Sequence, residues 1–350
     1  MMASSLPPSA IPPGVFLGIG NPLLDMVATV DKDFLRKYDV TMNSASMAEE
    51  RHLPLLDELL EHFDPQFNAG GCAQNSVRVT QWMVGIPGAT ATMGCIGLDE
   101  LGTIMKQCIL AAGVNSCYLE DPDAATGTSS TIISAQGERA LITNFAAATK
   151  FNANHLHTSS ARSLIGAAKF IYVHGFFLMD NADSLMEVAR VAAQEDKTFM
   201  LNLAAPFLMH YFQERVLPAV PYCDYLFCND AEALAFGHIK GWGEDVPKIA
   251  LLMAALPKIS GTRPRVVVVT QGAGETVVAA QGKITTYAVE KLANELLVDI
   301  NGAGDAFVGG FVAKLLQGEK LGNCVRAGHW VARTIIQEQG CKLPRVCDFV

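Results

Sequence analysis

Positive charge is scarce in this sequence. Its 26 lysines and arginines are outnumbered by 35 aspartates and glutamates, which gives a formal net charge of −9. No basic cluster with interleaved aromatic residues is present. Nucleic acid is therefore excluded as a partner, because contacts to a phosphate backbone need a basic surface. A small anion such as ATP needs only backbone amides, one or two cations and a metal ion, so an acidic protein can still bind it.

Long apolar runs and paired cysteines are missing as well. No apolar stretch approaches the roughly twenty residues of a membrane helix, and the first positive side chain, Lys32, comes too late for a secretory signal. The nine cysteines include no C-x-x-C pair, and the closest two, Cys223 and Cys228, do not have the spacing of a zinc site. Reduced thiols are the simplest interpretation, so we expect a cytoplasmic protein that has no membrane partner.

The rest of the composition is that of a folded α/β protein. Half of the 350 residues are hydrophobic, which is enough for one large domain with an accessory part. Residues 1–14 contain four prolines and are interpreted as a flexible leader. Beyond them, apolar strand-like segments alternate with helical ones, which predicts a largely parallel sheet covered by helices on both faces. The predicted strands are 15–19, 89–96, 170–173, 199–203, 225–228 and 266–269. The predicted helices are 52–63, 77–84, 101–110, 183–195, 209–216, 246–256 and 324–337.

Two segments do not match this alternation. Residues 21–43 mix short alternating stretches with polar breaks. Residues 126–145 contain two β-like runs, 129–134 and 140–145, around a turn at 136–138. We interpret both segments as a small, discontinuous β-rich lid. The predicted boundaries are 22–45 and 120–147 for the lid, and 15–21, 46–119 and 148–350 for the large α/β domain.

The most informative motif is Asp299-Ile300-Asn301-Gly302-Ala303-Gly304-Asp305, which leads into an apolar helical pattern. Small residues at a helix N-terminus leave backbone N–H groups unpaired, and the helix dipole adds positive charge there, so the loop suits an anion. The adjacent carboxylate of Asp305 suits a base for a hydroxyl group that attacks phosphorus. The alternative is that the glycines only form a tight turn and that Asp305 caps the helix.

Two further motifs offer polar groups for a ligand. The stretch 18–25 lacks the third glycine of a dinucleotide fingerprint, which argues against an NAD-dependent oxidoreductase. It does place Asn21 and Asp25 at a predicted strand end, where α/β folds bind ligands, and a carboxylate there suits a ribose diol. In the stretch 68–76, paired glycines allow close backbone approach and Asn75 stands at a helix start. Either motif alone could be structural.

In this chain order, the three motifs resemble those of the ribokinase-type (PfkB) carbohydrate and nucleoside kinases. The similarity runs from about Val15 to the C-terminus and is greatest to the nucleoside-specific members, the adenosine kinases. Stretches that carry it include Gly20 to Asp25, Gly175-Phe176-Phe177-Leu178 and Thr270-Gln271-Gly272. The resemblance implies a ribokinase-like fold and ATP-dependent phosphorylation of the ribose 5′-hydroxyl of adenosine, giving AMP and ADP in purine salvage. It also implies a monomer that uses Mg²⁺ with ATP.

The resemblance assigns roles to individual residues. The catalytic residues it implies are Asp305 as the base, Gly302, Ala303 and Gly304 as an anion hole, and Arg139 closing over the phosphates. The substrate-binding residues it implies are Asn21, Leu23, Asp25, Gly70, Gly71, Cys72, Asn75, Phe145, Phe177 and Phe207. The ATP-binding residues it implies are Asn229, Glu232, Thr270, Gly272, Gly274, Asn301 and His329. Mg²⁺ is expected at Asn229 and Glu232, through bound water.

Several alternatives stay open at this point. Arg139 could be a solvated charge at a hairpin, and Asn229 and Glu232 could be a helix cap and a first-turn acid. Ile300 stands where most family members have threonine, and Cys72 where adenosine kinases often have serine. The acceptor could therefore be another nucleoside, such as inosine or guanosine, or a free sugar such as ribose. A nucleoside-binding protein without catalysis is the non-enzyme alternative, and the intact Asp305, glycine loop and Arg139 argue against it.

Overall fold

The computed structural model describes residues 11–349 except 43, 136, 137, 260 and 262, and for Ala45 it describes the backbone alone. The first ten residues of the predicted leader and two residues of the predicted 136–138 turn thus lie outside the described residues. The end of the predicted leader packs against the protein. Ile11 is buried in a core cluster, and the Gly14 N–H donates to the Gly88 carbonyl at 2.8 Å, so residues 11–14 are not flexible.

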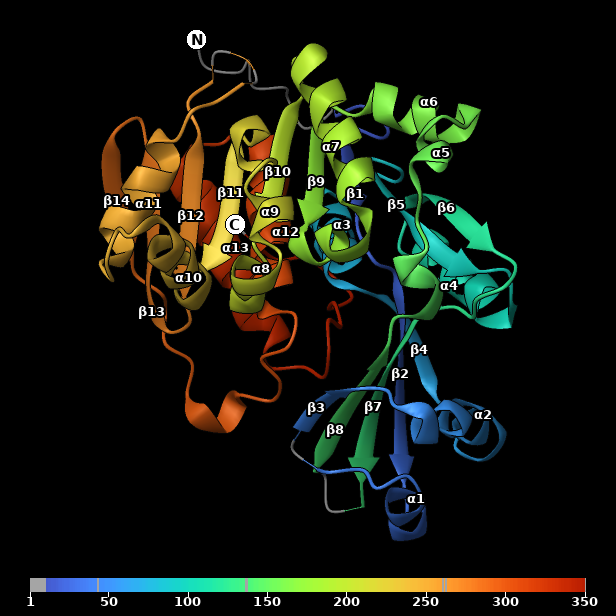
Figure 1. The fold of residues 1–350 in the computed structure, drawn as a ribbon. Helices are drawn as coiled ribbons and strands as arrows, with labels where there is room; N and C mark the ends of the chain where they lie inside the picture. The colour runs from blue at the N-terminus through green and yellow to red at the C-terminus, as the bar shows by residue number, and fades with distance from the viewer. Residues whose placement is uncertain (1–10, 43, 136–137, 260, 262, 350) are drawn as a thin grey trace.

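One large sheet organises the molecule (Figure 1). Its strand order is β14-β13-β12-β11-β10-β9-β1-β5-β6. The strands from β12 to β6 run parallel, and β13 and β14 form an antiparallel hairpin at one edge. Its strands are β1 (Phe16–Ile19), β5 (Thr90–Gly97), β6 (Asn115–Asp121), β9 (Phe170–His174), β10 (Thr198–Asn202), β11 (Tyr225–Asn229), β12 (Val266–Gln271), β13 (Gly274–Ala280) and β14 (Lys283–Tyr287).

Both faces of the large sheet are apolar because alternate side chains of a strand point to opposite faces. In β9, Ile171 and Val173 join one hydrophobic cluster and Tyr172 joins the other. Helices bury each face. The first cluster contains α5 (Ala153–Leu156), α6 (Ser159–Ala167), α7 (Leu178–Gln194), α8 (Pro206–Tyr211), α9 (Gln213–Val216), α10 (Asp230–Lys240) and α11 (Val246–Ala255). The second contains α3 (Cys72–Val84), α4 (Glu100–Ala111), α12 (Ala303–Leu316) and α13 (Leu321–Ile335).

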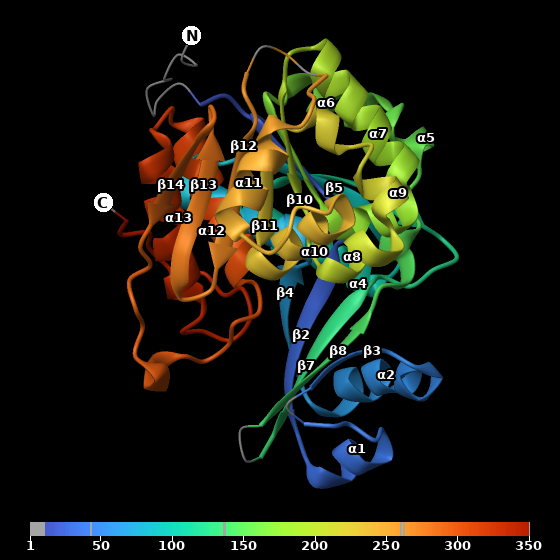
Figure 2. The ribbon, with the colours of Figure 1, turned by 60° about the vertical axis from the view of Figure 1, so that its left-hand side comes forward.

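A second, five-stranded sheet projects from the large layer and is well separated in Figure 2. Its order is β3-β8-β7-β2-β4, and it joins pieces of chain that are far apart in sequence. Its strands are β2 (Leu23–Val30), β3 (Ser44–Met47), β4 (Gln66–Gly70), β7 (Thr128–Ser134) and β8 (Arg139–Asn144). On one face Met26, Ala28 and Ile132 form a core with α1 (Lys32–Lys37) and α2 (Leu53–His62). The other face is turned toward the cavity described below.

The predicted fold class is confirmed: a mostly parallel α/β sheet with helices on both faces and a second sheet. One segment lies elsewhere than predicted. Strand β4 pairs antiparallel with β2, and α2 packs on the same small sheet, although both fall inside the 46–119 piece assigned to the large domain. The physical reason is that β4 is short and polar, with only its last two residues buried, so it carries no clear strand signal. Among the described residues, none of the helices is both long and apolar enough to span a bilayer.

Candidate active site

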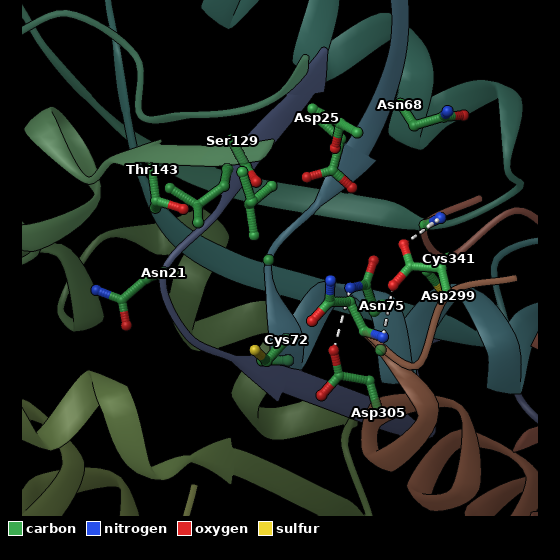
Figure 3. Close-up of a pocket in the computed structure, with 18 of the residues that line it drawn as sticks. Asn21, Asp25, Asn68, Cys72, Asn75, Ser129, Thr143, Asp299, Asp305 and Cys341 are labelled. Carbon is green, nitrogen blue, oxygen red and sulfur yellow. Dashed lines mark hydrogen bonds between the residues drawn. The ribbon is translucent and has the colours of Figure 1, made fainter. Parts of the chain in front are cut away.

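A cavity of about 320 Å³ lies between the small sheet and the large layer. Its lining includes Asn21, Asp25 and Asn75, and Figure 3 shows these side chains with Asp305 around one space. A second cavity of about 200 Å³ lies over the carboxyl ends of β10, β11 and β12. The two cavities share Asp305 in their lining. The arrangement therefore offers two neighbouring binding spaces with one carboxyl group at their boundary.

The small sheet supplies one wall of the first cavity. Residues 23, 25 and 27 of β2 line it, whereas residues 24, 26 and 28 of the same strand are buried on the opposite face. Ser129 and Thr131 of β7 and Thr143 of β8 follow the same rule. This alternation directs the carboxyl group of Asp25 into the cavity and keeps its apolar neighbours in the core.

The carboxyl group of Asp25 packs tightly against Gly70, the last residue of β4, just before α3 begins. A Cβ atom placed on Gly70 would lie 2.2 Å from the Asp25 carboxyl oxygens, so only glycine fits there. Gly71 has a φ of +93° and would meet the Asn21 carbonyl oxygen at 2.3 Å if it carried a side chain. Burial raises the pKa of Asp25 to about 7, and the nearby guanidinium of Arg78 opposes that rise.

Asp305 belongs to the first turn of α12, which follows Gly302 at a φ of +77°. Asp305 is only 7% exposed, and its side chain accepts a hydrogen bond from the Asn75 amide at 3.1 Å. The Ser76 hydroxyl donates to its backbone carbonyl at 2.9 Å, which fixes α12 against α3. Burial raises the pKa of Asp305 to about 7, while hydrogen bonds from Asn75 and Cys72 lower it. The carboxyl group is thus held in place and directed into the shared space.

In the glycine loop before α12, some backbone amides close a turn and others stay available to bind a ligand. The Ala303 N–H already donates to the Ile300 carbonyl at 3.2 Å, so it closes a turn. Gly302 and Gly304 line the cavities, and a Cβ atom on Gly304 would meet no heavy atom within 4 Å. Amides in the first turn of a helix have no partner one turn earlier, so the loop still presents donors to an anion. The side chain of Ile300 is 68% exposed and contributes nothing to the cavity.

The second cavity is lined by polar groups at strand ends. Asn229 caps α10, and its side-chain oxygen accepts from the Glu232 N–H at 2.8 Å. Glu232 accepts in return from the Asn229 backbone N–H at 2.9 Å and side-chain amide at 2.8 Å. Burial raises the pKa of Glu232 to about 7. Thr270 ends the adjacent strand, and the predicted Asn301 lines the first cavity instead.

Two predicted aromatic contacts need correction. Phe177 does not border the cavity, since it is 1% exposed and packs edge-on against Phe151 at 5.3 Å between ring centroids. Its neighbour Phe176 lines both cavities, because the 3₁₀ turn Gly175–Phe177 that follows β9 points successive side chains in different directions. Phe207 is not in the lining of either cavity, but it stacks on the outside of Phe176 at 6.1 Å and 17°.

Other predicted ligands of ATP and phosphate also lie outside the two cavities. The His329 ring bonds to the Thr276 hydroxyl at 2.7 Å and lies against Phe307. Gly272 and Gly274 form the exposed turn between β12 and β13. Arg139 donates to the Val298 carbonyl at 2.9 Å, so it joins the small sheet to the chain before the glycine loop. In this structure none of these four contacts the space around Asp305.

The structure adds residues that the motifs missed. Besides Phe176, the chief one is His174, which lines both cavities and is 5% exposed. Burial lowers the pKa of His174 to about 3, so the ring is neutral. It is the last residue of a parallel strand, and the rule that ligands bind at such strand ends could have identified it. Further missed lining residues are Asn68, Ser129, Asp299, Gln339 and Cys341.

The two adjacent phenylalanines allow a direct test of these positions. Phe177→Ala is expected to lower the free energy of unfolding by about 3–5 kcal/mol, because it empties a buried core position. Phe176→Ala is expected to leave stability within about 1 kcal/mol and to weaken nucleoside binding about tenfold, since it removes an aromatic wall. Denaturant unfolding and nucleoside titration of both variants measure this difference. Equal losses of stability would show that Phe176 is also a core residue.

Comparison with known proteins agrees with this geometry. The family model of the pfkB family carbohydrate kinases matches residues 32–346. "Adenosine kinase 1" of Arabidopsis thaliana is 46% identical over 337 residues, which are 96% of this chain and 98% of that protein. The structure is similar to that of Anopheles gambiae adenosine kinase in complex with P1,P4-di(adenosine-5) tetraphosphate, with a TM-score of 0.81, 40% identity, and coverage of 94% of this chain and 97% of the other. It is also similar to Schistosoma mansoni adenosine kinase in complex with adenosine and AMP, with a TM-score of 0.82, 29% identity and coverage of 95% and 98%.

Proposed function

The chain belongs to the pfkB family of carbohydrate kinases, and we propose that its two cavities hold adenosine and ATP with Asp305 between them. The reaction is adenosine kinase chemistry: the γ-phosphoryl group of ATP passes to the ribose 5′-hydroxyl, giving AMP and ADP. The observation that supports these positions best is the shared carboxyl group. Asp305 lines both cavities, and Asp25 lines only the one whose aromatic and polar lining suits a nucleoside.

In this proposal Asp305 is the base. As the 5′-oxygen bonds to the γ-phosphorus, the bond from that phosphorus to the bridging oxygen of ADP breaks and the hydroxyl proton passes to Asp305. Asn75 holds the carboxyl group in place through its 3.1 Å hydrogen bond. Free first-turn amides of α12 stabilise the charge on the transferred oxygens, an effect for which one such donor contributes about 3 kcal/mol to the barrier.

The other cavity wall would bind the ribose. Asp25 accepts hydrogen bonds from its two secondary hydroxyls, and Asn21 and Asn75 line the same space. Phe145 and Phe176 border the remaining volume and offer aromatic faces to a purine. A free sugar would leave those aromatic walls uncovered, which is why a nucleoside fits this cavity better than ribose.

Asn229 and Glu232 are suited to bind the proposed Mg²⁺ through metal-bound water rather than directly. Both carboxylate oxygens of Glu232 already accept hydrogen bonds from Asn229, yet each keeps a lone pair that can bind metal-bound water. Mg²⁺ prefers oxygen ligands and retains several waters, so this pair suits it. When bound, the ion neutralises charge on the ATP phosphates.

Glu232→Gln tests this magnesium site. The variant is expected to need about tenfold more Mg²⁺ for half-maximal activity, because neighbours of metal-bound groups commonly change affinity by 10–100-fold. The measurement is the initial rate against free Mg²⁺ at fixed ATP. Glu244→Gln, which changes an acid that is 83% exposed, is the control and should leave that curve unchanged. A normal curve for Glu232→Gln would place the ion elsewhere.

Two further points belong to the proposal. We propose a monomer as the active form, as the resemblance to the adenosine kinases implies. The nine cysteines are all free, which supports a reducing compartment such as the cytoplasm. A screen of ATP consumption with adenosine, inosine, guanosine and ribose tests the acceptor. Fastest turnover of ribose, or none of any nucleoside, would contradict the proposal.

A further inference from the structure

Three different metal-binding side chains meet at the boundary of the two cavities. Cys72 is the first residue of α3, His174 is the last residue of β9, and Asp305 lies in the first turn of α12. One sulfur, one ring nitrogen and one carboxylate oxygen of these residues all lie within 4.8 Å of one another. Figure 3 shows the Cys72 sulfur on the same side of the cavity as the Asp305 carboxyl group.

The free lone pairs of these side chains point to a ligand. Asn75 donates to Oδ2 of Asp305, which leaves Oδ1 on the side of His174, 4.0 Å from Nε2. His174 is 5% exposed, its Nδ1 is buried without a hydrogen-bond partner among the described residues, and the 4.0 Å from its Nε2 to Oδ1 of Asp305 is too long for a hydrogen bond. Buried polar atoms are normally paired, so an unpaired one needs an explanation. Phosphoryl transfer itself needs only the carboxylate as a base here. The thiol hydrogen-bonds to that carboxylate, and the imidazole has no part in the proposed reaction.

We propose that Cys72, His174 and Asp305 bind a zinc-class cation at the base of the first cavity. Thiolate, imidazole and carboxylate together form a donor set of catalytic and inhibitory zinc sites, whereas Mg²⁺ prefers oxygen donors alone. With metal–ligand distances of about 2.0–2.3 Å, the ligand atoms of a tetrahedral site lie roughly 3.3–3.7 Å apart. The three atoms therefore need to approach one another by about 1.5 Å at most. The thiol releases its proton on binding, and water takes the fourth position.

This site is separate from the magnesium site and has the opposite effect. Asn229 and Glu232 offer oxygen atoms, while Cys72 and His174 offer sulfur and nitrogen. A cation on Asp305 occupies the oxygen that would accept the 5′-hydroxyl proton. Zinc is therefore expected to inhibit phosphoryl transfer reversibly and in competition with adenosine. This inhibition rests on the proposed function, but the binding of the cation does not.

The binding test uses the metal-free full-length protein and Co²⁺, which replaces Zn²⁺ in such sites and gives a coloured thiolate complex. One Co²⁺ per chain is expected, with a sulfur-to-cobalt absorption band that excess Zn²⁺ abolishes and excess Mg²⁺ does not. Cys72→Ser should lose that band, and His174→Ala should weaken Co²⁺ binding at least tenfold. Circular dichroism of each variant checks that it is folded, and Cys72→Asp, which keeps a ligand but removes the sulfur, is a second variant at that position.

The control is another cysteine beside a histidine. Cys117 lies with its sulfur 3.4 Å from the His155 ring, away from both cavities. Cys117→Ser should keep the cobalt band. A band that disappears with Cys117 and persists in Cys72→Ser would overturn the proposal, and so would the absence of any thiolate band in the wild type.

The inhibition test compares rates with and without buffered free Zn²⁺ at constant excess Mg²⁺. The inhibition constant for Zn²⁺ is expected to rise at least tenfold in Cys72→Ser, each variant being compared with its own zinc-free rate. Equal sensitivity of wild type and Cys72→Ser would contradict inhibition at this site. If the chain did not phosphorylate adenosine at all, the proposed function would fail while the cobalt spectra would still decide the metal site.

Discussion

Replacing Asp305 by asparagine is expected to lower kcat by about 10²–10⁴-fold, the usual contribution of a positioned general base. Asparagine has nearly the same shape, and its carbonyl oxygen can still accept the hydrogen bond that Asn75 donates at 3.1 Å. It cannot take the proton of the 5′-hydroxyl. The loss should therefore appear in turnover, with the affinity for adenosine changed less than about tenfold.

Initial rates of AMP formation at saturating substrates, together with an adenosine titration of the variant, measure both quantities. Asp299→Asn is the matched comparison, since Asp299 is another carboxyl group in the lining of the same cavity. It should reduce the rate far less. If Asp299→Asn abolished turnover and Asp305→Asn preserved it, Asp299 would be the base.

Replacing Asp25 by asparagine is expected to raise the KM for adenosine roughly 100-fold, with a smaller effect on kcat. A charged acceptor that binds two hydroxyl groups is replaced by a neutral one, and hydrogen bonds to charged groups contribute about 1.5–3 kcal/mol each. A loss of about 3 kcal/mol corresponds to roughly two orders of magnitude in affinity. Asp33→Asn, at a side chain that is 85% exposed, is the control and should behave as wild type.

Adenosine binding by the wild type should also depend on pH through Asp25. Its pKa is about 7 in the folded protein, so the carboxyl group is charged above that pH and protonated below it. The KM for adenosine should therefore fall as the pH rises from 6 to 8, and the KM of Asp25→Asn should change little over the same range. A pH profile that is identical in both proteins would show that another group controls binding.

Ionisation of Asp25 is expected to destabilise the folded protein as the pH rises, although it strengthens adenosine binding over the same range. Its pKa is raised from 3.8 to about 7 on folding, so its contribution to stability is present below about pH 3.8 and is lost as the pH rises to about 7. Without nucleoside, Asp25→Asn should therefore have a higher Tm than wild type at pH 8, and this difference should be smaller at pH 5. Thermal unfolding at the two pH values measures this. A lower Tm at pH 8 would mean that Arg78 already offsets the burial of the charge.

The large sheet could be predicted from sequence because its strands are continuous apolar runs. Ile171 and Val173 alternate with Tyr172, yet all three are buried, and such a run is typical of a parallel strand covered on both faces. Strand β4 could not be predicted in the same way. Its first three residues, Gln66 to Asn68, are exposed or only partly buried and contain a single apolar side chain, and the segment forms a strand by pairing with β2. Its pairing depends on a neighbour about 40 residues away rather than on its own composition.

Some residues of the site could likewise be predicted from the sequence, and others could not. Asp25, Asn75 and Asp305 each stand in a short motif whose glycines have a local reason, and the structure brings all three to one cavity. Whether Phe176 or Phe177 faces the cavity depends on how a 3₁₀ turn directs two identical side chains. The sequence alone does not distinguish them. His174 stands in no motif. The rule that ligands bind at the ends of parallel strands could have identified it, but its position beside Asp305 depends on tertiary packing that the sequence pattern does not describe.

The junction at Gly70 and Gly71 has a consequence for how a nucleoside acts on the whole molecule. Strand β4 ends at Gly70 in the small sheet, α3 begins at Cys72 in the large layer, and Gly71 alone separates them. A ribose ring that touches Asp25 on one side and Asn75 on the other bridges that joint. Sugar hydroxyl groups would then hold the small sheet against the large layer, and a deoxynucleoside, which lacks one of these hydroxyl groups, should raise the Tm of the protein less than a ribonucleoside does.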